Sequence, residues 1–416
     1  MASRMVVGLM GLGVIGSGVW RACEDRASLL AERVGRPLLI KKALVRDAAR
    51  PRPGVPADLL TTEPRDILAD DEVEIVVEVL GGERPAYDYV KQALAAGKHV
   101  VTANKELLAK HGQELFALAQ QRSLELGCEA SVGGGIPIIA ALRKGLAANR
   151  IVGLRGIVNG TTNYILTEMA EKGRDFAAAL SEAQALGYAE PDPTNDVEGY
   201  DARYKLAVLC GLAFGAWPRP EEIPCRGITR LAPADLTLAR ELGYAVKLLA
   251  AARPRASAVE ASVQPALVPF ANPLAGVAGV FNAVQVQGDL VGDMLFYGRG
   301  AGPEPTASAI LADVIAVARG ERSPLPTAGE RVGVLSDDAV PGRHYLRVQL
   351  QAHGSAAAVM ERLAGGGLRV RDTRLVGAEV AFLVEAPGAA AVRAVAEQLL
   401  LAPTAGHLAM ALPVAD

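Results

Sequence analysis

The sequence predicts an α/β protein with three domains: an N-terminal Rossmann-type parallel sheet, an α+β domain, and a C-terminal βαββαβ domain. Over the first 130 residues, short apolar strands alternate with helical stretches. That alternation is typical of a parallel sheet covered by helices on both faces. The middle of the chain mixes helices with Gly- and Val-rich strands, and the last 70 or so residues alternate in the βαββαβ order.

Composition narrows the class of protein. A chain of 416 residues with 50% hydrophobic and 21% charged residues can build several packed cores. The net charge of -3 gives no electrostatic reason to expect nucleic acid or a membrane surface as a partner. No apolar run reaches the length of a membrane-spanning helix, and the start of the chain lacks a secretory pattern. The four cysteines have no Cys-x-x-Cys spacing, so a cytoplasmic protein without a soft-metal cluster is expected.

The predicted elements follow in chain order. Strands are expected at 5–10, 38–45, 74–80, 99–102 and 124–129, with helices from the first glycine turn to about 33, at 86–96 and at 105–121. The middle domain has predicted helices at 137–148, 163–171, 176–186, 200–214 and 307–319, a strand at 153–159, and short β segments within 257–290. Residues 321–342, rich in Pro, Gly and charge, predict a linker to a last domain at 343–416.

The first turn carries the clearest cofactor signal. Gly11, Gly13 and Gly16 form a Gly-x-Gly-x-x-Gly pattern that follows a strand and opens a helix. Such glycines allow a tight turn, close approach of a pyrophosphate and close helix–strand packing. At the end of the second strand, Arg46 favours the 2′-phosphate of NADP, whereas the adjacent Asp47 keeps NAD open.

Asp201 and Lys205 form a second candidate site. They are four residues apart on a predicted helix, so they share one face about 6 Å apart. A lysine ammonium can stabilise a developing alkoxide and donate the proton, while a carboxylate holds the lysine charged and in place. From spacing alone, a surface ion pair is the more common explanation.

These motifs together resemble homoserine dehydrogenase, in the three-domain bacterial form with an appended ACT-type domain. The resembling segments are 11–18, 101–105, 129–137, 159–166, 186–206 and 298–309. They imply reversible reduction of L-aspartate 4-semialdehyde to L-homoserine with a nicotinamide cofactor, NADP or NAD. They also imply a Rossmann domain over 1–130 to which about 301–320 return, and a substrate and dimerisation domain over 131–320.

The resemblance assigns roles to individual residues. Lys205 matches the family's acid/base lysine, positioned by Asp201, and Lys105 is its rival for proton transfer near the nicotinamide. Substrate binding falls to Glu190, Asp196 and Thr161, and the remaining cofactor contacts fall to Val14, Ile15, Lys105, Gly187 and Gly302.

The segment from Glu129 to Ile136 suggests a cation site. Its three glycines let carbonyls converge, and Glu129 adds a hard oxygen, which suits a hard, weakly held cation. The resemblance implies structural sodium bound by Glu129, Val132, Gly134 and Ile136; a flexible interdomain hinge is the alternative.

The tail resembles an ACT domain but lacks the family's usual Asp-x-Pro-Gly turn, since residues 351–355 read Gln-Ala-His-Gly-Ser. A threonine effector site and a purely structural or dimerising tail therefore both stay open. The resemblance also implies a homodimer or homotetramer. Two rivals remain: another nicotinamide-dependent oxidoreductase of a small amino or keto acid, and a catalytically inactive amino-acid sensor.

Overall fold

The computed structural model describes residues 4–322, 330–335, 340–350, 355–401 and 406–415. They form two compact units. The first comprises Met1–Val152, Tyr204–Glu222 and Val286–Gly333, and the second comprises Gly153–Arg203, Ile223–Gln285 and Val334–Asp416. No helix among the described residues is long and apolar enough to cross a membrane.

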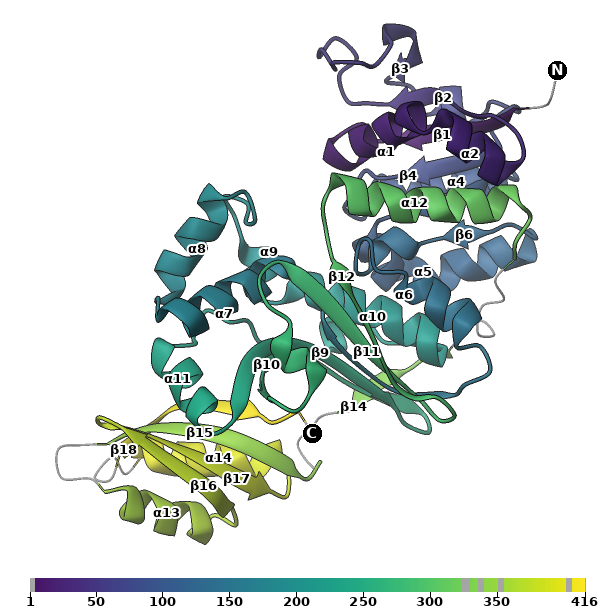
Figure 1. The fold of residues 1–416 in the computed structure, drawn as a ribbon. Helices are drawn as coiled ribbons and strands as arrows, with labels where there is room; N and C mark the ends of the chain where they lie inside the picture. Colours follow the sequence, from purple (N-terminus) through teal and green to yellow (C-terminus); the bar gives the residue numbers. More distant parts are fainter. Residues whose placement is uncertain (1–3, 323–329, 336–339, 351–354, 402–405, 416) are drawn as a thin grey trace. The chain divides into compact units, whose positions relative to one another are not determined.

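The first unit is built on the predicted parallel sheet, in the order β3-β2-β1-β4-β5-β6 (Figure 1). Its strands are β1 (Met5–Met10), β2 (Leu38–Leu44), β3 (Leu60–Thr61), β4 (Ile75–Glu78), β5 (His99–Thr102) and β6 (Leu126–Gly127). The two-residue β3 was not predicted, because so short a strand has no periodicity to read. The Rossmann-type fold class is confirmed.

Helices cover this sheet. They are α1 (Val14–Asp25), α2 (Ala27–Val34), α3 (Arg65–Leu68), α4 (Ala86–Ala95), α5 (Lys105–Gln121) and, from much later in the chain, α12 (Pro303–Ala318). One helix was predicted where α1 and α2 lie; the structure breaks it at Arg26, whose φ of -121° is not helical. α12 packs against α1, and its Ile310 and Val314 share a buried core with Leu9 and Val77.

The mixed sheet has the order β12-β11-β7-β9-β10-β14. β segments were predicted within 257–290, where β10 (Ala258–Pro269) lies, whereas its partner β9 (Tyr244–Pro254) precedes that range and was not predicted. The two strands form an antiparallel hairpin paired from Val259↔Pro254 to Pro269↔Tyr244. The other strands are β7 (Ile151–Ile157), β11 (Phe281–Gly288), β12 (Gly292–Arg299) and β14 (Gly333–Leu335). A separate two-stranded sheet pairs β8 (Ala216–Trp217) with β13 (Glu330–Arg331).

The helices of this middle region are α6 (Ile138–Ala140), α7 (Gly160–Lys172), α8 (Phe176–Ala185), α9 (Thr194–Val197), α10 (Tyr200–Phe214) and α11 (Pro233–Glu241). The helix predicted over 137–148 is reduced to α6 followed by a π-helical turn at Ala141–Gly145.

The C-terminal part of the second unit has the predicted βαββαβ order. It consists of β15 (Gly342–Leu350), α13 (Ala356–Gly365), β16 (Arg369–Val376), β17 (Glu379–Ala386), α14 (Ala389–Leu401) and β18 (Gly406–Pro413). The sheet order is β16-β17-β15-β18, with antiparallel pairs throughout. Residues 351–354, where the family's turn motif is missing, lie outside the described residues.

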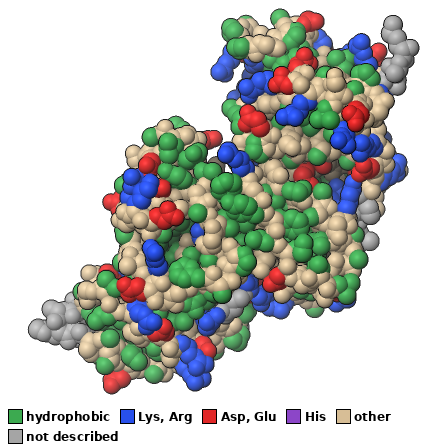
Figure 2. All heavy atoms as spheres, viewed as in Figure 1, with side chains coloured by type: hydrophobic (Ala, Val, Ile, Leu, Met, Phe, Trp, Pro, Cys, Tyr) green, Lys and Arg blue, Asp and Glu red, His purple; other side chains and the backbone are tan. Residues whose placement is uncertain are grey.

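Charged side chains are dispersed over the face shown in Figure 2. Figure 2 shows acidic and basic side chains interspersed on the visible face rather than gathered by sign. This pattern agrees with the near-zero net charge and with small-molecule partners.

Candidate active site

The glycine loop between β1 and α1 has the geometry that a pyrophosphate needs. Gly11 has a φ of +104°, and a Cβ there would lie 2.9 Å from the Val79 carbonyl oxygen. A Cβ on Gly16 would lie 2.0 Å from the Gly11 carbonyl oxygen, so only glycine fits. Gly13 is exposed, with no atom within 4 Å of its would-be Cβ, and α1 begins at Val14 without a side-chain cap. The helix N-terminus is therefore open to a phosphate group.

A pocket of about 570 Å³ adjoins this loop. Its lining joins Gly13 and Val14 to the 50–55 segment and carries three guanidinium groups, from Arg21, Arg50 and Arg52. The Trp20 indole N–H donates to the Gly54 carbonyl at 3.1 Å and so ties this segment to α1.

Arg46 and Asp47, the residues predicted to select between NADP and NAD, follow the end of β2. Arg46 is exposed and is not among the residues that line this pocket. The Asp47 carboxylate accepts a hydrogen bond from the Ala49 N–H at 2.8 Å, within its own turn. Arg50 and Arg52 thus line the space beside the glycine loop and Asp47 does not, although the Arg52 guanidinium also donates to the Asp47 and Arg50 carbonyl oxygens at 3.0 and 2.9 Å.

In the second unit, Asn159 brings two of the predicted site carboxylates together. Its amide nitrogen donates to Asp196 Oδ1 at 2.7 Å and to Asp201 Oδ2 at 3.0 Å. Its amide oxygen accepts from the Thr162 N–H at 2.8 Å, which caps α7. Sequence reasoning did not single out Asn159, although an Asn directly before a helical stretch is a common N-cap signal.

The loop that carries Glu190 is held by Thr161. The Thr161 hydroxyl donates to the Tyr188 carbonyl oxygen at 2.6 Å, and the rings of Tyr164 and Tyr188 lie 5.1 Å apart. Gln184 donates to the Glu190 carbonyl oxygen at 3.1 Å. Thr161 therefore has a protein partner for the hydroxyl that was expected to contact substrate, whereas the Glu190 side chain is exposed.

Asp201 and Lys205 lie one turn apart on α10 and are 8% and 9% exposed. Burial of both side chains argues against the alternative of a plain surface ion pair, which gains little and is solvated. The position of the pair on one helix is fixed by spacing, but its burial could not be read from spacing.

Lys105 is the first residue of α5, and another lysine of this helix contacts the residue before Lys205. The ammonium of Lys110 lies 5.8 Å from the centre of the Tyr204 ring, and Tyr204 directly precedes Lys205. A Cβ on Gly112 of α5 would come within 2.5 Å of the Trp217 ring. The two candidate acid/base lysines therefore lie on helices whose side chains contact each other.

The Glu129 carboxylate, a predicted cation ligand, accepts hydrogen bonds from two backbone N–H groups. Its two oxygens accept hydrogen bonds from the Ile139 and Ala140 N–H groups at 2.8 and 2.6 Å. The Glu129 N–H in turn donates to Asp313 Oδ2 at 2.8 Å. Burial raises the pKa of both carboxyls. Among the described residues, no cluster of three His, Cys, Asp or Glu side chains could hold a metal ion.

Gly187 and Gly302 both occupy helix ends. Gly187 has a φ of +74° just after α8, and Gly302 has a φ of +123° just before α12. A positive φ favours glycine at both places. The backbone conformation alone therefore explains these two glycines, whether or not they also contact the cofactor.

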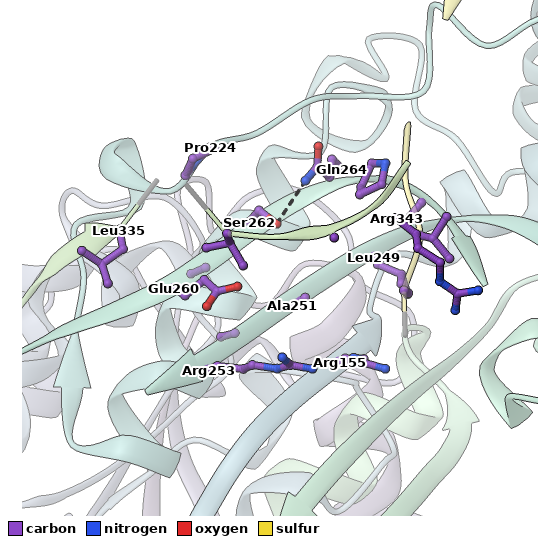
Figure 3. A pocket seen from close by; sticks show the side chains of 18 of the residues that line it. Arg155, Pro224, Leu249, Ala251, Arg253, Glu260, Ser262, Gln264, Leu335 and Arg343 are labelled. Carbon is purple, nitrogen blue, oxygen red and sulfur yellow. Dashed lines mark hydrogen bonds between the residues drawn. The ribbon is translucent and has the colours of Figure 1, made fainter. Parts of the chain in front are cut away.

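The second unit also contains a pocket of about 220 Å³ between the β9–β10 hairpin and the start of β15 (Figure 3). Its charged lining includes Arg155, Arg253, Arg343 and Glu260. Glu260 faces Arg253 across the hairpin and also pairs with Arg255. The lining includes no predicted catalytic, substrate or cofactor residue.

Comparison with known proteins adds independent findings. Residues 11–127 match the family model "Homoserine dehydrogenase, NAD binding domain", and residues 137–315 match "Homoserine dehydrogenase". A homoserine dehydrogenase of Pseudomonas aeruginosa is 44% identical over 379 residues, which cover 88% of this chain and 87% of that protein.

Solved structures agree. A homoserine dehydrogenase from Thiobacillus denitrificans superposes with a TM-score of 0.90 at 41% identity, covering 99% of this chain and 98% of that one. A hyperthermophilic archaeal homoserine dehydrogenase in complex with NADPH has a TM-score of 0.66 at 25% identity, covering 77% of this chain and 99% of that one.

Proposed function

The chain belongs to the homoserine dehydrogenase family, and on that premise we propose that its reaction is carried by the carboxylates joined at Asn159 together with Lys205 and Lys105. The enzyme is an NAD(P)-dependent oxidoreductase that interconverts L-aspartate 4-semialdehyde and L-homoserine. The observation that carries the residue assignment is the Asn159 amide, which donates hydrogen bonds to both Asp196 and Asp201. Asp201 lies one helical turn before the buried Lys205.

The proposed chemistry is a hydride transfer with proton delivery. A nicotinamide cofactor held at the Gly11–Gly16 loop would supply a hydride for the aldehyde carbon. The aldehyde oxygen then develops negative charge, which the Lys205 ammonium stabilises and protonates. Asp201, held by the Asn159 amide and one helical turn before Lys205, orients that ammonium. In the reverse direction the Lys205 amine removes the hydroxyl proton; Lys105 is the competing donor.

The substrate's amino-acid end is assigned to the loop after α8. The exposed Glu190 carboxylate is available to pair with the substrate ammonium, and Asp196 assists it. Thr161 acts on this loop through its bond to the Tyr188 carbonyl, so we assign it a positioning role beside any direct contact.

For the cofactor we propose NADP. Arg21, Arg50 and Arg52 line the pocket beside the glycine loop, where they could bind a 2′-phosphate. Arg46 lies shortly before this segment in the sequence. NAD binding would favour an acidic partner for the ribose hydroxyl, and Asp47 is engaged in its own turn. Replacing Arg50 and Arg52 by Ala should weaken NADPH binding far more than NADH binding. Equal losses for both cofactors would contradict this assignment.

A structural monovalent cation, of which sodium is the candidate, remains a proposal. Gly133 and Gly134 have φ values of +74° and +55°, and a Cβ on Gly134 would lie 2.5 Å from the Gly300 carbonyl oxygen. Only glycine fits this turn, and a turn without Cβ atoms lets backbone carbonyls converge on a cation. Because two N–H groups occupy the Glu129 carboxylate, the proposal rests mainly on the carbonyls of Val132, Gly134 and Ile136.

We also propose a homodimer or homotetramer and an ACT-like role for the tail. Apolar side chains are exposed along the β11–β12 hairpin, at Leu290, Val291, Met294, Leu295 and Tyr297, as an assembly surface would require. The pocket of Figure 3 offers both guanidinium and carboxylate groups, which suits an amino acid such as threonine. Light scattering tests the assembly, and kinetics with and without threonine test the effector.

The test of the catalytic assignment uses Lys205→Ala and Lys105→Ala, with Lys91→Ala as the matched control. Lys91 is a helical lysine in an exposed pair with Glu114. Lys205→Ala should lower kcat by about 100-fold or more while NADPH binding stays close to wild type. If Lys105→Ala has that effect and Lys205→Ala does not, the proton role moves to Lys105.

A further inference from the structure

A fully buried carboxylate lies at the carboxyl end of β4, in the first unit. Glu78 is 0% exposed and stands opposite Thr102 in the register of β4 with β5. Its carboxylate accepts the Thr102 hydroxyl at 2.5 Å, the Leu80 N–H at 2.8 Å and the Asn104 amide at 3.5 Å. The neighbouring residues of β4 are apolar valines and an isoleucine.

Asn104 extends this network to two loops. Its amide nitrogen also donates to the Gly82 carbonyl at 2.7 Å, and its amide oxygen accepts the Leu107 N–H at 3.1 Å as the N-cap of α5. Its own N–H donates to the Thr102 hydroxyl at 3.0 Å. The network therefore fixes the loop after β4 and the first turn of α5, where Lys105 is the first helical residue.

Burial of a carboxylate at this place is costly unless donors surround it. Burial raises the pKa of Glu78, and the hydrogen bonds from Thr102, Leu80 and Asn104 oppose that shift. An apolar residue would pack into the same sheet without this requirement. The carboxyl ends of parallel strands are where such folds bind ligands, so the network lies where positioning matters.

We propose that Glu78, acting through Thr102 and Asn104, is a positioning residue that sets the backbone of Lys105 and of the Gly81–Gly82 turn. The proposal rests on the proposed function in one respect, the presence of Lys105 at the active site. Gly81 and Gly82 have φ values of +75° and +70°, so the turn is made of two consecutive left-handed residues. The Asn104–Gly82 bond fixes this turn to the start of α5.

The experiment separates the effect of the Thr102 hydroxyl from the effect of the side chain's volume. Thr102→Val keeps the volume and removes the hydroxyl, whereas Thr102→Ser keeps the hydroxyl and removes a methyl group. The matched control is Thr61→Val, because Thr61 is another buried strand-end threonine. It donates to Asp66 at 2.5 Å and accepts the Glu63 N–H at 3.0 Å.

A positioning role predicts that Thr102→Val and Glu78→Gln lower kcat by about 10- to 100-fold. NADPH binding and the melting temperature should stay near those of Thr61→Val, and Thr102→Ser should recover most of the activity. A packing role predicts the opposite order for the two Thr102 variants. Wild-type kcat in Thr102→Val, or loss in Thr102→Ser alone, would overturn the proposal.

Lys105→Ala, alone and combined with Thr102→Val, tests whether Lys105 belongs to the active site and, separately, whether Thr102 acts through it. If Thr102 acts through Lys105, the double variant should be little slower than Lys105→Ala. Effects that multiply would overturn the link to Lys105. Full activity in Lys105→Ala would instead refute the assignment of Lys105 to the active site, and with it this proposal.

Discussion

The buried ion pair between Arg347 and Asp235 gives the sharpest stability prediction. Arg347, on β15, donates from Nε to Asp235 Oδ1 at 2.7 Å and from a terminal nitrogen to Oδ2 at 3.0 Å. The Asp235 side chain is 0% exposed and that of Arg347 is 8% exposed. The perturbation is Arg347→Met, which keeps the apolar stem and leaves the carboxylate behind.

The cost follows from what remains around Asp235. Removing one partner of a buried pair costs about 3–5 kcal/mol. The Tyr345 hydroxyl at 3.2 Å and the Ala232 N–H at 2.9 Å still serve the Asp235 carboxylate, so we expect about 3 kcal/mol. That corresponds to an opening equilibrium about 100-fold more favourable, because each ~1.4 kcal/mol is tenfold.

The assay is hydrogen–deuterium exchange of peptides from α11 and β15. A chain with several domains does not unfold in one two-state step, so a local measurement is needed. The control is Arg371→Met, which breaks an exposed pair with Glu385 whose side chains are 40% and 41% exposed. It should accelerate exchange by about twofold or less. Equal exchange of α11 in the two variants would refute the reasoning.

Three further predictions concern other buried groups. Burial raises the pKa of Asp313 to about 7, so its contribution to stability is complete below about pH 4 and is lost as the pH rises through 7. Asp313→Asn should therefore gain in urea midpoint relative to wild type between pH 5 and 8, and parallel midpoints would contradict this. Gly112→Ala places a Cβ within 2.5 Å of Trp217 and should cost about 1–3 kcal/mol, measured as faster hydrogen–deuterium exchange of α5 peptides. Gly145→Ala, with open space at its Cβ, should leave exchange unchanged. Asn159→Ala removes the amide that donates to two carboxylates. It should lower kcat/KM for homoserine by about 10- to 100-fold and leave NADPH binding unchanged. An unchanged kcat/KM would exclude Asn159 from the site.

Local sequence signals were enough for several parts of the molecule. The glycine turn, the strand–helix alternation and the tail order depend on short-range patterns, and the structure has them where expected. α5 shows the same: Asn104 caps the helix that the sequence predicts from Lys105. Asp201 and Lys205 share a helix face for the same local reason.

Other parts could not be read this way. β9 contains Lys-Leu-Leu-Ala-Ala-Ala, a composition that favours helix, yet it is a strand because β10 and β7 satisfy its backbone on both sides. The Glu129 carboxylate accepts from the Ile139 and Ala140 N–H groups, and nothing in the local pattern indicates these partners. Partners ten or more residues away have no signal in the local pattern.

The sequence by itself determined the fold class, the family, and the residue types available for hydride transfer and proton delivery. Periodicity, turn glycines and motif order are local properties, so they can be read without coordinates. Only the tertiary structure decided which of those groups are buried and what they contact. Asn159 joins Asp196 to Asp201, Thr161 holds the loop of Glu190, and Glu78 meets Thr102 across two strands. Hydrogen bonding and desolvation depend on distances between segments far apart in the chain, and packing alone sets those distances.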